Sequence, residues 1–397
     1  MARAKIELHE FIGDPFGLLE KARATGWLAD FPPLTGVVRY ADVRELLGDS
    51  RLRANFPQFL EALGISSGTF YEWMAISPLN KDGAEHQQWR TVMSRAFTPR
   101  RVEQIRPFLH RAAHELVDAF AARGSCEFVG EFADVYPSLG LCELIGVPKE
   151  DRDHFRTLAN TISLGFNPIE LGSRIGEVDA ALTELLAYTA DLAAKRRAEP
   201  RDDLITKLAQ AGHEDGWNED MVHGAIAGLV FAGHETTKNQ LGWTVAVLSE
   251  RPGIWDGIAN GDFPVTDVIE EVLRYRSTVT GIGRAVAEPI ERNGDRLEPG
   301  MQVLLSTWSA NQDEREYANP KDVDPARNGD VPHLAFGHGA HHCLGAALAR
   351  AELQEGLAAM TSRLTCPVVG ADAAWKPTVG INGPVRLPIR FEARVTG

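Results

Sequence analysis

The sequence predicts a mainly α-helical protein with a small β part. Three observations predict this class: apolar residues recur at helical spacing over long, proline-poor runs, segments of strand character are few and short, and no repeat or linker divides the chain. Length alone would allow two or three domains, but without a linker we expect residues 1–397 to form a single domain.

The predicted elements follow from these patterns. Helices are predicted over residues 101–123, 176–198, 218–250, 266–275 and 344–363. Segments that alternate apolar and polar residues, or that favour β-branched ones, predict strands over residues 36–40, 290–292, 301–306 and 388–395. An Asn293-Gly294 pair predicts a hairpin turn directly after the second of these strands.

Acidic residues outnumber basic ones, with 55 Asp+Glu against 41 Lys+Arg and a formal net charge of −14. Such a balance excludes general binding to nucleic acid or to an anionic membrane. Residues 1–14 mix charged and apolar side chains and form neither a signal peptide nor an anchor, so a cytoplasmic protein is expected. The cysteines are too scattered for disulfides, and we expect Cys126, Cys142 and Cys366 to be small core residues.

The segment 218–250 predicts the longest helix. Asn218 can cap its start and Pro252 follows its end, which gives about 30 residues, or roughly 45 Å. Residues 224–233 are apolar on every side, which predicts burial all round but is too short to cross a bilayer. The helix therefore crosses the interior of the domain.

A short polar cluster interrupts this helix at residues 233–237. Ala232, Gly233 and Thr236 share one face that presents only small groups, so a flat group could lie against it. The Thr236 hydroxyl can bond back to the Ala232 carbonyl, and Glu235 could supply protons. Alternatively, Thr236 only bonds back and Glu235 only forms a salt bridge. A zinc-protease motif is excluded because Lys238 stands where it needs a second histidine.

A glycine-rich loop, residues 336–345, places a single cysteine where the helix 344–363 is predicted to begin. Amide groups and the helix dipole favour an anion at that position, so Cys343 is expected to be a thiolate. A lone thiolate flanked by glycines suits the iron of a planar macrocycle. The neighbouring histidines also leave open a zinc or copper site. These histidines are His333, His338, His341 and His342.

This loop resembles the cysteine-ligand loop of the cytochrome P-450 haem monooxygenases. The matching residues are Phe336, Gly337, Gly339, His341, Cys343 and Gly345. The resemblance implies the cytochrome P-450 fold, with haem b (iron protoporphyrin IX) buried between the long central helix and the loop. It implies Cys343 as the iron ligand, with Phe336, His341 and Gly345 in contact with the cofactor.

Other segments extend the resemblance. Residues 232–237 look like the family's oxygen-binding groove, which implies that Ala232 and Gly233 face the cofactor and that Thr236 and Glu235 are the catalytic alcohol and acid. Glu271 and Arg274 match the family's Glu-x-x-Arg motif, and Arg327 lies in a segment similar to the one that supplies their partner. We expect these three charges to form a structural network that braces the cysteine loop.

Four donors correspond to the family's ligands of the haem propionates. His86 and Arg90 lie four residues apart on one helical face, and Arg284 and His341 complete the set. Without a haem, a His and Arg at this spacing usually form a solvated surface pair, so that alternative remains for His86 and Arg90.

The resemblance implies a monooxygenase that uses O2 and electrons from NAD(P)H. The chain is too short to include a reductase, so a ferredoxin or flavodoxin-type donor is expected; alternatives are a peroxide-driven peroxygenase and a non-enzymatic haem-binding protein. A small hydrophobic or aromatic substrate and a monomeric protein are expected. Family analogy lines the pocket with Phe70, Tyr71, Trp73, Met74, Phe166, Val279 and Ile282.

Arginines cluster in one stretch of this acidic protein. They are Arg95, Arg100, Arg101, Arg106 and Arg111. In the family this stretch lies near the cysteine face, so the hypothesis is that it docks an acidic ferredoxin. A merely solvated helix face is the alternative.

Overall fold

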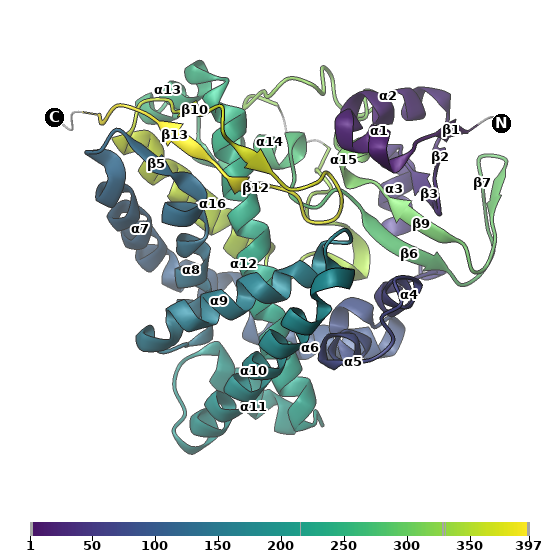
Figure 1. Cartoon of the computed structure of the whole chain (residues 1–397), viewed down its shortest axis with the longest axis horizontal. Helices are drawn as coiled ribbons and strands as arrows, with labels where there is room; N and C mark the ends of the chain where they lie inside the picture. The colour runs from purple at the N-terminus through teal and green to yellow at the C-terminus, as the bar shows by residue number, and fades with distance from the viewer. Residues whose placement is uncertain (1–2, 215, 328, 330, 395–397) are drawn as a thin grey trace.

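The computed structural model describes residues 3–214, 216–327, 329 and 331–394. Helices form most of this part of the chain and strands form small sheets, which confirms the predicted class (Figure 1). Most helices pack into one large body, and the largest sheet lies in a smaller region beside it. Helix α12 (Glu219–Ser249) runs through the middle of the helical body.

The helices lie before, between and around the strands in the chain. Their bounds are α1 (Leu8–Gly13), α2 (Pro15–Thr25), α3 (Tyr40–Leu47), α4 (Phe56–Ala62), α5 (Thr69–Ile76), α6 (Gly83–Ala96), α7 (Pro99–Ala121), α8 (Val135–Ile145), α9 (Arg152–Ser163), α10 (Leu171–Ala198), α11 (Leu204–Glu214), α13 (Pro252–Asn260), α14 (Val265–Tyr275), α15 (Thr307–Ala310) and α16 (Ala346–Arg363). Short helical turns include η4 (Leu164–Phe166) and η5 (Gly339–His341). No helix of the described residues is long and apolar enough to cross a membrane.

The largest sheet has the strand order β1-β2-β3-β9-β6-β4, and the smaller sheets are β10-β13-β5, β11-β12 and β7-β8. Their bounds are β1 (Ala4–Lys5), β2 (Leu28–Phe31), β3 (Leu34–Val37), β4 (Leu52–Arg53), β5 (Ser125–Glu127), β6 (Ile282–Val286), β7 (Ile290–Arg292), β8 (Asp295–Leu297), β9 (Gln302–Leu305), β10 (Val368–Val369), β11 (Ala374–Trp375), β12 (Pro384–Arg386) and β13 (Pro388–Arg390). β6 lies antiparallel to β9 in the register Arg284 to Val303. This pairing fixes the position of Arg284 within the sheet.

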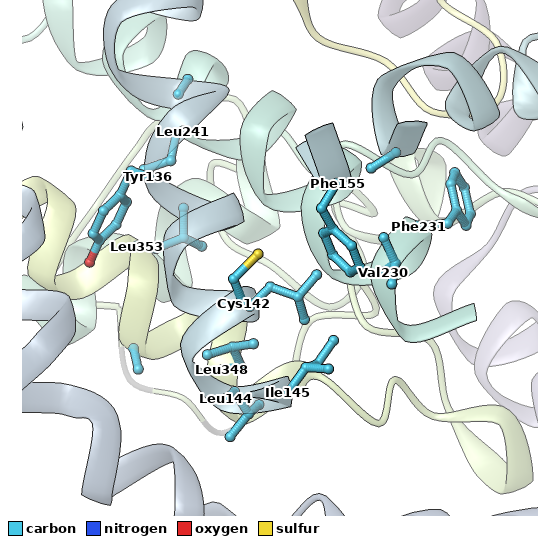
Figure 2. Packing of buried hydrophobic residues seen from close by; sticks show 14 of the residues in the cluster. Tyr136, Cys142, Leu144, Ile145, Phe155, Val230, Phe231, Leu241, Leu348 and Leu353 are labelled. Atoms are coloured by element: carbon cyan, nitrogen blue, oxygen red, sulfur yellow. The ribbon is translucent and has the colours of Figure 1, made fainter. Parts of the chain in front are cut away.

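The long central helix begins and ends as predicted. The Asn218 side chain accepts a hydrogen bond from the backbone N–H of Met221, and α13 begins with Pro252. Helices α8, α9 and α16 pack around α12, and Figure 2 shows Cys142 of α8 among apolar side chains of these helices. Cys142 is therefore the small core residue that was expected.

Several predicted boundaries are wrong. The helix predicted over 176–198 begins at Leu171, and the one predicted over 101–123 runs from Pro99 to Ala121. The strand predicted over 36–40 ends at Val37, because the backbone N–H of Tyr40 donates to Asp313 Oδ2 (2.9 Å) and α3 begins there. The strand predicted over 388–395 ends at Arg390, and Val395 lies outside the described residues. The last helix begins at Ala346, two residues later than predicted.

Candidate haem-thiolate site

The loop that carries Cys343 is closed by its own backbone. The Cys343 N–H donates to the Phe336 carbonyl (2.9 Å), and Gly337 and Gly339 have φ angles of +70° and +74°. A Cβ on Gly339 would lie 2.9 Å from the carbonyl oxygen of Leu47 in α3. Only glycine fits this turn, because both the backbone conformation and the space exclude a side chain.

The Cys343 thiol is accessible to solvent although its loop is packed against neighbouring elements. Crowding by protein atoms raises the pKa of the thiol, and the N–H of Gly345 and the charges of Arg90 and Arg350 act in the opposite direction. Of the groups expected to favour a thiolate at Cys343, the Gly345 N–H is in place, but α16 begins three residues beyond the cysteine and the crowding outweighs these groups. Coordination to a metal ion deprotonates a thiol outright.

Two imidazoles lie against each other next to this loop. The ring centroids of His86 and His341 are 4.0 Å apart, and His341 Nε2 lies 3.2 Å from Asp82 Oδ1. Burial and the nearby positive charges of His341, Arg90 and Arg284 lower the pKa of His86 to about 4. The four predicted propionate ligands thus meet in one cluster.

This cluster has more positive than negative groups. Among the described residues no ion pair includes Arg90 or Arg284, and Arg284 Nη1 donates only to the Gly283 carbonyl (2.8 Å). Asp82 is the carboxylate that faces the cluster, and its second oxygen accepts from the Ala54 N–H (2.9 Å). A ligand with two carboxylates fits such a set of donors, because buried cations need anionic partners.

One face of α12 remains accessible in the interior. Ala232 is exposed and Thr236 is half-buried, so the prediction that residues 224–233 are buried all round is wrong. The Thr236 hydroxyl donates to the Ala232 carbonyl (2.7 Å), which confirms the predicted back-bond. A Cβ on Gly233 would lie 3.0 Å from Leu141 of α8, so its lack of a side chain also serves helix packing, and its contact with the cofactor stays a prediction.

Glu235 is buried beside Thr236 and is paired with two lysines. Lys238 Nζ lies 2.6 Å from Oε2, and Lys376 Nζ contacts Oε1. Burial works against ionisation, but the lysine charges prevail and lower the pKa of Glu235 to about 2. The salt bridge weighed as an alternative is therefore present, and the acid is ionised at neutral pH.

The predicted structural network is present. Arg274 Nε and Nη2 donate to the two Glu271 oxygens, each at 2.8 Å, and Arg327 Nε donates to Oε1 (3.0 Å). Arg274 also binds the backbone carbonyls of Asn311 and Asp322 (2.9 and 2.8 Å). The network thus holds the chain segments that lead into the cysteine loop.

Four of the predicted pocket residues do not lie as expected. Phe70, Trp73 and Met74 are at most 3% exposed and belong to the core, and the Trp73 indole N–H donates to the Gly224 carbonyl (3.1 Å). The Tyr71 hydroxyl instead binds Glu61 near the surface (2.6 Å). Family analogy predicts that this segment lies near the pocket, but the direction of each side chain depends on how α5 packs.

The other three predicted pocket residues are half-buried and lie near α12 or the cysteine loop. Phe166 is half-buried and stacks on Phe231 of α12, with ring centroids 3.8 Å apart. Val279 and Ile282 are also half-buried, and a Cβ on Gly337 would lie 3.4 Å from Ile282 Cδ1. Ile282 therefore borders the cysteine loop.

The arginine cluster is partly neutralised. Arg101 is buried and pairs with Asp202, and Arg106 pairs with Glu103 (2.8 Å) and Glu355 (3.0 Å). The hypothesis of a five-arginine patch is therefore wrong for these two residues. Arg95, Arg100 and Arg111 are exposed.

The histidines next to Cys343 do not gather around a metal position. His333 lies 3.1 Å from Glu270 Oε2, whereas His341 contacts Asp82. Among the described residues no three His, Cys, Asp or Glu side chains form a group suited to a metal ion. The arrangement does not support the zinc or copper alternative.

Sequence reasoning missed two functional candidates. Glu352 of α16 is fully buried, and burial raises the pKa of its carboxyl well above the ordinary value. Thr237 lies beside this carboxyl. A signal was available, because Glu352 lies one turn after Leu348 and one turn before Gly356 on the buried face of the helix. Lys376 had no such signal, because its partner lies 141 residues away.

Comparisons with known proteins agree with this geometry. The cytochrome P450 family model matches residues 264–377. The luteothin monooxygenase of Streptomyces thioluteus is 32% identical over 374 residues, which cover 94% of this chain and 92% of that protein. The mycinamicin IV hydroxylase/epoxidase of Micromonospora griseorubida is 34% identical over 360 residues, covering 89% and 88%.

A solved structure shows the same fold over the whole chain. Cytochrome P450 CYP109Q5 from Chondromyces apiculatus superposes with a TM-score of 0.88 at 28% identity, covering 99% of this chain and 100% of that one. Together with relatives above 30% identity along nearly the full length, this shows the family. The chain belongs to the cytochrome P450 monooxygenases, which are haem-thiolate enzymes.

Proposed function

We propose that Cys343 ligates the iron of haem b, and that the propionates of this haem bind the cluster of His86, Arg90, Arg284 and His341. One observation carries the proposal: the exposed Cys343 lies beside two arginines and two imidazoles, and among the described residues Asp82 is the one carboxylate that faces them. A planar group with a metal at its centre and two carboxylates at one edge satisfies both features at once.

The haem supplies the oxygen chemistry when bound, and the chain supplies orientation and protons. Ala232 presents an accessible, small surface on α12 where a ligand can approach. Thr236 holds water near that surface through its hydroxyl, and Glu235 is the acid that feeds this water. The network of Glu271, Arg274 and Arg327 keeps the cysteine loop in place.

The substrate is a small hydrophobic or aromatic molecule. Phe166, Val279 and Ile282 are half-buried apolar side chains near the cysteine loop or the C-terminal hairpin, formed by β11, β12 and the loop between them. Behind them, the core aromatics Phe70 and Phe231 leave little room for rearrangement. An apolar wall of this kind selects by shape and burial of apolar surface rather than by charge.

Electrons come from a separate carrier, a ferredoxin or flavodoxin type protein that is reduced by NAD(P)H. The exposed Arg100 and Arg111 on α7 offer positive charge to an acidic carrier. We further propose that residues 1–397 act as one domain, since the cysteine loop, α12 and the C-terminal hairpin meet at one site.

The experiment is a ligand screen followed by isotope labelling. Compounds that shift the Soret band of the purified ferric protein are identified first, with luteothin and mycinamicin IV included because two relatives are named for them. Turnover of a hit with a surrogate redox partner under ¹⁸O2 is expected to place one labelled oxygen in the product. A product labelled only from H2¹⁸O, or none from any binding compound, would overturn the monooxygenase assignment.

A further inference from the structure

The contacts of Glu235 occupy both of its carboxylate oxygens. Lys238 Nζ lies 2.6 Å from Oε2, while Lys376 Nζ and Asn239 Nδ2 (2.9 Å) both contact Oε1. Thr236, the neighbour it would serve, is not among these partners, since its hydroxyl binds the Ala232 carbonyl. A carboxylate held in this way is charged and has a lysine against each oxygen, so it cannot pass a proton toward Thr236 until one of these contacts opens.

The two lysines are held differently. Lys238 Nζ is also 2.7 Å from Asn160 Oδ1 and 3.5 Å from Asp134 Oδ1, and its side chain is 12% exposed. For Lys376, Glu235 is the one ion-pair partner within the described residues, and its side chain is 23% exposed. Water can therefore replace Glu235 as the partner of Lys376 at lower cost than for Lys238.

Lys376 begins the loop that joins β11 to β12, here called the C-terminal hairpin loop (residues 376–383). Its N–H donates to the Gly383 carbonyl (2.9 Å), and its carbonyl accepts from Asn382 Nδ2 (2.9 Å). These bonds close the base of the loop. The backbone position of Lys376 is thereby tied to the rest of the loop.

The same loop forms part of the wall at the candidate pocket. Val279 pairs with Ile381 in an antiparallel bridge, and the Asn382 N–H donates to the Thr278 carbonyl (2.8 Å). At the tip, a Cβ on Gly380 would lie 3.0 Å from the Phe166 carbonyl oxygen. Two of the half-buried apolar residues, Val279 and Phe166, thus touch the loop that carries Lys376.

We propose that Lys376 is a positioning residue that couples occupation of the substrate pocket to the release of Glu235 for proton delivery toward Thr236. The inference rests on the proposed function. A ligand that displaces the C-terminal hairpin loop breaks the contact between Lys376 Nζ and Glu235 Oε1. Water then binds the Lys376 ammonium group in place of the carboxylate. Glu235, left with Lys238 and Asn239, accepts a proton from a hydronium ion of the solvent through this water and passes it to water held at Thr236, so one solvent proton enters for each proton delivered and the carboxylate is regenerated.

The first test is infrared titration of the carboxyl group of Glu235, assigned by subtracting the spectrum of the matching Glu235→Gln protein. Groups that face Glu235 are Lys238 and Asn239 on α12 and Lys376 on the loop, with Asp134 next to Lys238. In Lys376→Met the protonated-carboxyl band is expected at higher pH than in the wild type, and Lys376→Arg is expected to restore the wild-type titration. Lys195→Met, which removes an exposed lysine paired with Asp191 (2.7 Å), is the control and leaves the titration unchanged.

The second test measures coupling to the pocket with 4-phenylimidazole, an aromatic probe that binds haem iron. If probe binding must break the ion pair, Lys376→Met and Glu235→Gln each raise the affinity for 4-phenylimidazole by the same factor, about fivefold or more. The double variant then binds the probe no more tightly than either single variant. Equal probe affinities in all four proteins, or an unchanged infrared titration in Lys376→Met, overturn the inference. Failure of the probe to shift the Soret band in any protein instead counts against the proposed haem site.

Discussion

His86 and His341 are 255 residues apart in the chain, yet their ring centroids lie 4.0 Å apart, with the ring planes inclined by 31°. One stands in α6 and the other in η5 of the cysteine loop. Two imidazoles this close, with Arg90 and Arg284 nearby, repel each other's protonated forms. An anionic ligand bound beside the two rings and the two arginines offsets this repulsion.

Removing one of these imidazoles is expected to weaken haem retention. In His86→Gln or His341→Gln, one donor to a charged group is lost, which is worth about 1.5–3 kcal/mol and corresponds to haem loss about tenfold faster or more. Transfer of haem to apomyoglobin measures this rate. His154→Gln, an exposed histidine paired with Glu184, is the control, and equal rates in all proteins would contradict the propionate assignment.

The Glu271 network is expected to govern stability rather than chemistry. Glu271→Gln leaves the buried Arg274 without its charge partner, and removing one member of a buried pair costs about 3–5 kcal/mol. Urea unfolding measures the loss. Glu291→Gln breaks an exposed pair with Arg296 (2.7 Å) and should cost less than about 1 kcal/mol. Similar losses in both variants would argue against the bracing role.

Thr236 is expected to control how reducing equivalents are used. Thr236→Ala removes the hydroxyl that holds water at the accessible face of α12, so product formed per NAD(P)H should fall about tenfold or more while peroxide accumulates. Thr244→Ala is a matched control, since its hydroxyl makes the same back-bond to Gln240 (2.8 Å) on the same helix but is buried. Full coupling in Thr236→Ala would mean that protons arrive by another route.

Charge reversal at Arg100 tests the docking hypothesis without disturbing any ion pair of the described residues. Arg100→Glu reverses an exposed charge and should slow reduction by an acidic carrier, most strongly at low ionic strength, without changing substrate affinity. Arg101→Glu is unsuitable, because it also breaks the pair with Asp202. Stopped-flow reduction of the wild type, Arg100→Glu and the exposed control Arg390→Glu measures the effect. An unchanged rate of reduction in Arg100→Glu would contradict docking of the electron carrier at Arg100.

Glu352 should make stability depend on pH. Burial raises the pKa of its carboxyl above that of the unfolded chain, so the folded state binds more protons once the pH exceeds about 4.5. This contribution is present below that pH and is lost as the pH rises, by up to about 1.4 kcal/mol per pH unit. Glu352→Gln should therefore gain stability relative to the wild type between pH 5 and pH 8 in urea unfolding. A constant difference, as expected for the exposed control Glu72→Gln, would contradict the buried neutral carboxyl.

The sequence predicted those parts of the fold and site that depend on short, local patterns. The cysteine loop, the capped helix α12 and the Glu271 to Arg274 spacing could be read because their residues are close in the chain. The short helices α1 to α5, of 6–11 residues, show no clear helical period in the sequence.

Side-chain direction and long-range pairing could not be predicted. Phe70 and Tyr71 are neighbours, yet one is buried in the core and the other binds Glu61 near the surface, which only the packing of α5 decides. Likewise, the contact between Lys376 and Glu235 depends on the C-terminal hairpin folding back onto α12. No periodicity or motif encodes such a meeting.

The most direct test of the central claim is the absorption spectrum of the ferrous carbon monoxide adduct in the wild type, Cys343→Ala and Cys366→Ala. The wild type and Cys366→Ala, which removes a half-buried thiol beside the Leu248 carbonyl, are expected to show the red-shifted band of thiolate-ligated haem. Cys343→Ala is expected to lose it. An unchanged band in Cys343→Ala would contradict the account.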